Sequence, residues 1–124
     1  MEPKSAEGHQ GLGLTLAKRG NFGDSEKHLL EAVRLRPGLS TAWNNLGVLY
    51  VRQGAPERAA AALEQGIAEA PEDELLYLNL GRIYVQTKRY AEAKAAMLRL
   101  LQVNPKSRVA KKALEDLANA PIKP

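Results

Sequence analysis

Two asparagines separated by 34 residues, Asn45 and Asn79, carry side chains that could hydrogen-bond to a polypeptide backbone. An amide carries both a hydrogen-bond donor and an acceptor, so it can pair with both backbone groups of an extended peptide of any sequence. The alternative is that both asparagines are merely solvated. Each net hydrogen bond contributes only about 0.5–1.5 kcal/mol, so charges such as Arg52, Arg82 and Lys112 would have to add contacts.

Residue sets that could support catalysis or bind a metal are weak. His28 and Glu31 share a helix face at i, i+3 spacing, but a metal site needs at least a third ligand and none is evident. No Ser-His-Asp set or catalytic carboxylate pair can be argued, and cysteine is absent. The glycine-rich segment at residues 8–13 lacks the dinucleotide spacing. We therefore expect no enzyme activity, metal site or cofactor.

The composition fits one helical domain. The chain has 124 residues, of which 44% are hydrophobic and 26% charged, and this excludes a disordered tail. Aromatic residues are few, while alanine and leucine dominate, which favours helices over a β-sandwich. No apolar run approaches the roughly 18 residues of a membrane span. The first ten residues have no apolar signal-peptide core. The compartment stays open, with the cytoplasm slightly favoured.

The net charge of +4 is unevenly distributed. Residues 40–73 carry five acidic and two basic side chains, whereas residues 74–107 carry two acidic and six basic ones. A basic end can attract acidic partners or nucleic acid, and the alternative is that it is only a solvated helix face. We expect a protein or peptide partner rather than nucleic acid.

An internal repeat organises the chain, because residues 6–39, 40–73 and 74–107 align without a gap. Leucine, glycine and proline recur in register, at Leu12, Leu46 and Leu80, at Gly13, Gly47 and Gly81, and at Pro37, Pro71 and Pro105. We number positions from the first residue of each repeat, so that residues 6, 40 and 74 are position 1. Positions 4, 7, 8 and 11 have helical spacing, and so do positions 20, 24 and 27. Each repeat therefore predicts two helices, with the glycine at position 8 and a small residue at position 20 allowing a close crossing.

Turn and cap residues punctuate these helices. The predicted turns are Gly20-Asn21, Gly54-Ala55-Pro56 and Lys88-Arg89, and Pro56 suits the first turn of a helix. The prolines at position 32 end the second helices. Ser40, Asp73 and Ser107 are predicted to cap the helices that follow them.

The repeats resemble the tetratricopeptide repeat (TPR), whose pattern is Trp-x2-Leu-Gly-x2-Tyr followed by Ala and Pro at fixed offsets. Residues 43–50 read Trp-Asn-Asn-Leu-Gly-Val-Leu-Tyr, and residues 77–84 read Tyr-Leu-Asn-Leu-Gly-Arg-Ile-Tyr. The first repeat is degenerate, since His9, Leu16 and Ser25 replace the aromatic, tyrosine and alanine. His9 is expected to be a packing residue. The resemblance implies an all-α, right-handed α-solenoid of three helical hairpins.

The same resemblance implies that first helices line a concave groove that binds an extended, acidic partner segment. The implied groove residues are Gln10, Leu14, Lys18, Asn44, Asn45, Val48, Arg52, Asn79, Arg82, Gln86 and Lys112. One TPR class clamps the C-terminal carboxylate of chaperones, and of its five groove residues only Asn45 matches here. Chaperone-tail binding is therefore not expected.

The two ends of the chain are predicted to differ. Residues 1–5 form a lead-in, and residues 120–124 form a frayed tail. Residues 108–119 are expected to form a solvating helix that caps the array, with Glu115 where the repeat glycine would stand. The first helix has no such cover and carries Gly8 and Gly11 besides Gly13. The alternative function is therefore self-association through this helix, or a scaffold role within a longer chain.

Overall fold

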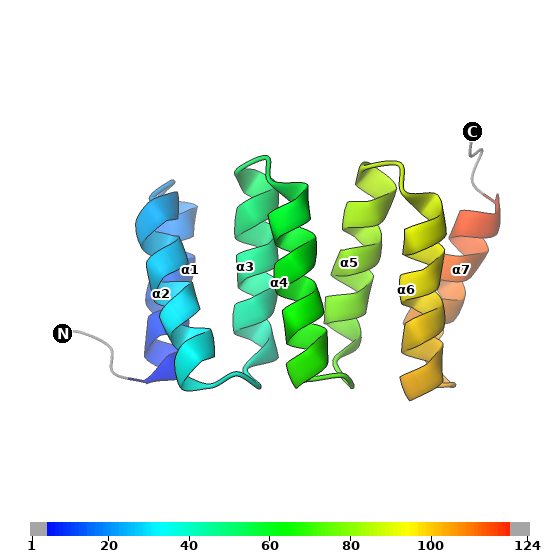
Figure 1. Ribbon diagram of the computed structural model, residues 1–124, viewed down its shortest axis with the longest axis horizontal. Coiled ribbons are helices and arrows are strands. Elements are labelled where there is room, and N and C mark those ends of the chain that lie inside the picture. The colour runs from blue at the N-terminus through cyan, green and yellow to red at the C-terminus, as the bar shows by residue number, and fades with distance from the viewer. Residues whose placement is uncertain (1–4, 120–124) are drawn as a thin grey trace.

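The computed structural model describes residues 5–119, and these form seven α-helices without a strand. They are α1 (Ala6–Lys18), α2 (Phe22–Leu35), α3 (Ser40–Arg52), α4 (Pro56–Glu69), α5 (Glu74–Gln86), α6 (Tyr90–Val103) and α7 (Arg108–Asn119). The helices follow one another in a row, with α1 and α7 at opposite ends (Figure 1). The prediction of an all-α solenoid is confirmed. The predicted lead-in and tail fall largely outside the described residues.

The hairpin turns use left-handed backbone where the sequence indicated a turn. Gly20 and Gly54 have φ values of 81° and 73°, which glycine adopts without strain. The third turn places Lys88 in the same region, at φ 62°. Pro56 begins α4, as predicted.

Two of the three predicted helix caps form. The carboxylate of Asp73 accepts a hydrogen bond from the backbone N–H of Leu75, and the hydroxyl of Ser107 accepts one from Ala110. The prediction for Ser40 is wrong, because α3 begins at Ser40 itself and its hydroxyl donates to Asp73 instead. A hydrogen bond from a hydroxyl to a carboxylate oxygen is stronger than one between neutral groups, which favours this partner for Ser40.

The repeat glycines at position 8 allow the two helices of each hairpin to pack closely. A Cβ at Gly13 would lie 2.8 Å from Leu29 Cγ, and one at Gly47 would lie 3.0 Å from Leu63 Cγ. The close neighbour is thus the side chain at position 24, while the small residues at position 20 are fully buried. This packing brings the two helices of each hairpin into close contact.

The contacts between helices define an inner and an outer layer. In the described part of the chain, α1 contacts α3, α3 contacts α5 and α5 contacts α7, whereas α2, α4 and α6 do not contact one another. The first helices therefore lie closer together than the second helices, and the row curves around them. We call the surface of α1, α3, α5 and α7 that faces away from the second helices the concave face.

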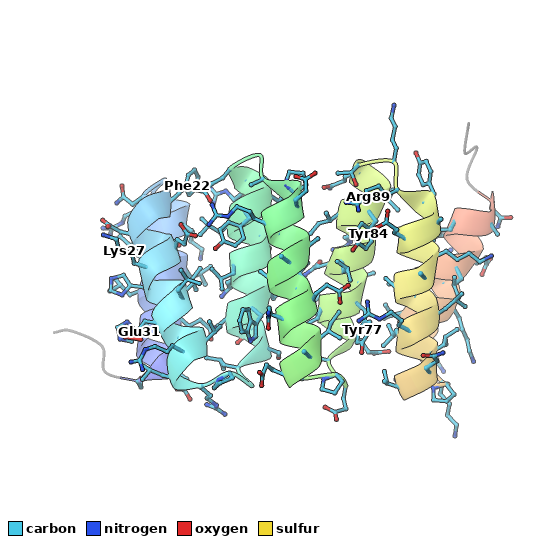
Figure 2. The ribbon with its side chains drawn as sticks, in the orientation of Figure 1. Phe22, Lys27, Glu31, Tyr77, Tyr84 and Arg89 are labelled. Atoms are coloured by element: carbon cyan, nitrogen blue, oxygen red, sulfur yellow. The ribbon has the colours of Figure 1, made fainter. Side chains whose placement is uncertain are left out.

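Charged and aromatic side chains form contacts between neighbouring helices. Glu26 on α2 accepts hydrogen bonds from Tyr50 and Arg58, and Arg99 on α6 forms a two-pronged ion pair with Glu64 on α4 at 2.9 and 3.0 Å. Figure 2 shows Arg89 beside Tyr84 near the α5–α6 turn. The Arg89 guanidinium lies 5.1 Å from the centre of that ring. These contacts link neighbouring helices on the side away from the concave face.

Candidate functional site

The concave face begins with a polar contact between α1 and α3. The hydroxyl of Thr41 donates to Gln10 Oε1 at 3.0 Å. Beside this contact the face is apolar, because Leu14 and Val48 are 40% and 48% exposed. Exposed aliphatic side chains on neighbouring helices offer apolar area that a bound segment could cover.

A chain of hydrogen bonds links α3 to α5. The side-chain amide of Asn79 donates to Asn44 Oδ1, and Arg82 donates to Asn79 Oδ1 at 3.4 Å. Both polar groups of Asn79 are therefore engaged within the protein. Asn45 is half-buried, and within residues 5–119 its side chain has no hydrogen-bond partner. Of the two asparagines that the sequence singled out, Asn45 is the one with both amide groups available.

Arg52 is directed toward the first hairpin. Its guanidinium donates to the carbonyl oxygen of Ala17 at 3.1 Å and lies 5.0 Å from the centre of the Phe22 ring. Arg82 bonds instead to Asn79 on its own helix and lines a cleft farther along the face. These contacts give Arg52 a part in joining the first two repeats.

Lys112, on the capping helix, forms an ion pair with Asp116 at 3.1 Å, and this contact raises the pKa of the lysine. Both side chains are exposed, so the pair adds little stability. Lys18 and Gln86, the other predicted residues, are also exposed and lie near the ends of α1 and α5.

A cleft of about 590 Å³ opens where α5, α6 and α7 meet. Arg82 and Asp116 line it, and so does Gln86. Its remaining lining is apolar, consisting of Leu78, Gly81, Val85, Ala93, Met97, Ala113 and Leu117. Such a volume lies within the range of about 300–1,000 Å³ that is typical of ligand pockets.

Sequence reasoning missed this cleft. The signal that could have found it is Ala113, which stands at repeat position 6 where the two preceding repeats have Asn45 and Asn79. An alanine where the two preceding repeats have asparagine indicates a junction at which the amide cannot form a hydrogen bond. Cleft formation then depends on what the neighbouring helix places opposite that position.

His9 packs as predicted, half-buried and stacked on His28 with ring centres 5.3 Å apart and their Nδ1 atoms 3.1 Å apart. Glu31 bonds Arg34, which lowers the pKa of that carboxyl. Within residues 5–119, no group of three or more His, Cys, Asp or Glu side chains is placed to hold a metal ion. None of the helices described is long and apolar enough to cross a membrane.

Two matches to the family described as tetratricopeptide repeat cover residues 11–74 and residues 50–117. A TPR repeat-containing protein of Pseudomonas aeruginosa is 36% identical over 92 residues, which cover 69% of this chain and 36% of that protein. Cilia- and flagella-associated protein 70 of Homo sapiens is 29% identical over 104 residues, covering 82% of this chain and 9% of its own length. The chain thus spans little more than a third of the first relative and under a tenth of the second.

Solved structures share the fold. The first TPR of Spaghetti (RPAP3), bound to the HSP90 peptide SRMEEVD, matches with a TM-score of 0.73 at 17% identity, over 93% of this chain and 91% of that one. The Arabidopsis OM64 TPR domain matches with a TM-score of 0.73 at 20% identity, over 93% and 95% of the two chains. At these identities the likeness concerns the fold alone.

Proposed function

Because the chain belongs to the tetratricopeptide repeat family, we propose that it is a protein-interaction module whose concave face binds an extended, acidic segment of a partner protein. The observation that carries this proposal is the half-buried amide of Asn45, whose donor and acceptor have no partner within residues 5–119. An amide fixed on a rigid helix can pair with the backbone of a bound segment at little entropic cost.

The preference for acidic partners rests on Arg82. Within the described residues it forms no ion pair, and its one side-chain hydrogen bond reaches the neutral Asn79. A carboxylate would gain a charge-assisted hydrogen bond from this guanidinium. The peptide SRMEEVD, which the similar TPR domain of Spaghetti (RPAP3) binds, also carries acidic residues. The residues of the chaperone clamp are absent here apart from Asn45, so a chaperone C-terminus is not the expected ligand of this chain.

Affinity capture tests the proposal. The immobilised chain is compared with the double variant Asn45→Ala/Arg82→Ala and with Ala95→Leu, an exposed position on α6 outside the concave face. Proteins identified by mass spectrometry should be retained by wild type and by Ala95→Leu and lost from the double variant. Partners retained equally by all three would contradict the concave-face assignment.

A second candidate function is self-association. A hollow of about 290 Å³ at the capping end, lined by Tyr90 on α6 and by Leu114 and Leu117 on α7 among others, offers apolar surface to another copy. The sequence pointed instead to the first helix, α1, at the opposite end of the row. There the hydroxyl of Ser5 caps the helix by accepting a hydrogen bond from the backbone N–H of Gly8. Light scattering over a range of concentrations separates the two functions, because a constant monomer mass would exclude self-association.

A further inference from the structure

We propose that the cleft between α5, α6 and α7 is the specificity pocket of the concave face, and that it binds one bulky apolar side chain of the partner segment, with a carboxylate next to it at Arg82. This inference rests on the proposed function and goes further, because it names the side chain that selects the partner. The cleft is a separate part of the concave face, because Asn45 is not among the residues that line it.

The cleft owes its existence to a difference between successive repeats. Asn44 and Asn79 bridge α3 and α5 through their amides. The residues 34 positions later are Leu78 on α5 and Ala113 on α7, and both line the cleft. An apolar pair cannot form the amide bridge that ties α3 to α5, and α5 contacts α7 less extensively than α3 contacts α5. The surface that the bridge closes at one junction is therefore open at the next.

The walls suit an apolar occupant. The aliphatic side chains of Leu78, Val85 and Leu117 come from two helices, and Met97 closes the cleft from α6. A Cβ at Gly81 would lie 3.1 Å from Met97 Cε, so the glycine makes room for Met97 at the inner wall of the cleft. Methionine is flexible and adapts to the shape of what it contacts. Burying one large apolar side chain against such walls is favourable in proportion to the area removed from water.

The charges at the rim select what lies beside that side chain. Asp116 is paired with Lys112 at 3.1 Å, so the two charges largely cancel. Arg82 has no ion pair among the described residues, and its guanidinium donates only to a neutral amide. The rim therefore presents one uncompensated positive charge. A partner carrying Asp or Glu next to its apolar residue complements it.

The experiment selects ligands without assuming a partner. A phage-displayed library of short random linear peptides is panned on the wild-type chain, and the enriched peptides are synthesised with a fluorescent label. Their Kd is measured by fluorescence anisotropy for wild type, Ala113→Leu, Ala113→Asn, Arg82→Gln and Asn45→Ala. Leucine at 113 fills the cleft, and asparagine restores the residue that stands in register in the two preceding repeats. Ala95→Leu, which adds the same side chain on the outer surface of α6, is the matched control.

The enriched peptides should share a Leu, Ile, Phe or Trp adjacent to Asp or Glu. Ala113→Leu should weaken their binding by about tenfold or more, since it excludes an apolar side chain from the pocket. Ala113→Asn should weaken it in the same direction, while Ala95→Leu leaves it unchanged. Arg82→Gln should weaken acidic peptides but not versions in which the acid is replaced by its amide. Circular dichroism melts of every variant show whether the fold is retained.

One result would overturn the pocket alone, and two others would overturn both proposals. Peptides that bind both Ala113 variants as tightly as wild type, yet are weakened by Asn45→Ala, would overturn the pocket and leave the concave-face function standing. Peptides that ignore every concave-face substitution would overturn both proposals. A library that yields no enriched sequence would also overturn both, because a preformed pocket should select among random peptides.

Discussion

Asn79 donates its side-chain amide to Asn44 across α3 and α5, although the two residues differ by one position in the repeat. The bridge joins two first helices on the concave face, so it fixes the spacing of the surface that is proposed to bind. It is also the feature whose absence one repeat later opens the cleft.

Removing this bridge should lower stability. Asn44→Ala leaves the half-buried amide of Asn79 without its acceptor and should cost about 1 kcal/mol in the free energy of unfolding, measured by urea denaturation. Asn45→Ala is the neighbouring control, because the Asn45 side chain makes no hydrogen bond within residues 5–119, and it should stay within about 0.5 kcal/mol of wild type. Equal losses for the two variants would show that the bridge contributes nothing.

The fold could be predicted from the sequence because glycine and proline act locally. A glycine at position 8 makes room for Leu29 or Leu63 in its own hairpin, and a turn glycine such as Gly20 adopts positive φ whatever lies beyond it. The same local reasoning failed for Ser40, because the competing acceptor, Asp73, lies 33 residues away. Local pattern cannot weigh a cap against a partner from the next repeat.

The candidate site was predictable only in part for the same reason. The repeat places Asn45 and Arg82 on the concave face, but it cannot show that Arg52 bonds Ala17 or that Asn79 is already engaged. A cleft depends on pairs of residues from different helices, such as Leu78 and Ala113. Such pairs can be found once the repeats are compared across their junctions rather than position by position.

Glycine substitutions should separate close packing from backbone entropy. A Cβ at Gly66 would lie 2.7 Å from Trp43 Cβ, so Gly66→Ala should destabilise the chain by about 1–3 kcal/mol. Gly47→Leu should be worse, since it drives a whole side chain into Leu63. A Cβ at Gly81 meets only the flexible end of Met97, so Gly81→Ala should cost least of the three. Thermal melts followed by circular dichroism rank them, and an unchanged melting temperature for Gly66→Ala would refute the packing.

The first helix should be the least protected. Gly11 lies in α1 with nothing within 4 Å of a Cβ, so it contributes flexibility without enabling a contact. Amide hydrogens before Gly13 should exchange fastest among the helices, and Gly11→Ala should slow them while adding about 0.5–1 kcal/mol of stability. Slow exchange of the amide hydrogens before Gly13 in a verified wild-type monomer would contradict the prediction. Protection that appears only at high concentration would point to self-association.

Tyr50 should make the chain sensitive to alkali. The pKa of Tyr50 is raised from its ordinary 10.0 to about 12. Burial is the main cause, and the hydrogen bond that the phenol donates to Glu26 is the second. The unfolded chain therefore releases this proton first, so the stabilisation is complete below pH 10 and is lost as pH rises through 12. Near pH 12 the loss should reach about 2 kcal/mol. Tyr50→Phe, followed by urea denaturation at several pH values, should flatten the decline, and an identical slope would refute the assignment.

Arg52 and Arg82 should respond in opposite ways to the same truncation. Arg52→Ala removes a hydrogen bond to Ala17 and a cation–π contact with Phe22, so it should lower the melting temperature and leave the affinity per folded molecule little changed. Arg82→Ala loses only a long hydrogen bond to Asn79, so it should leave stability nearly unchanged and weaken acidic ligands most.

Arg52→Ala and Arg82→Ala should also differ in their effect on the salt dependence of binding. Exposed charge contacts are screened over about 8–10 Å at physiological ionic strength, so affinity for an acidic segment should fall as salt rises. Arg82→Ala should reduce that dependence, because it removes the positive charge at the rim of the cleft. Arg52→Ala should leave the slope unchanged, since its guanidinium is directed toward the first hairpin. Anisotropy titrations at low and high salt measure both slopes.

An affinity that changes neither with salt nor with Arg82→Ala would show that charge takes no part in recognition on the concave face. The acidic-partner proposal would then fail. The proposed amide contact of Asn45 would not be affected, because it does not depend on charge.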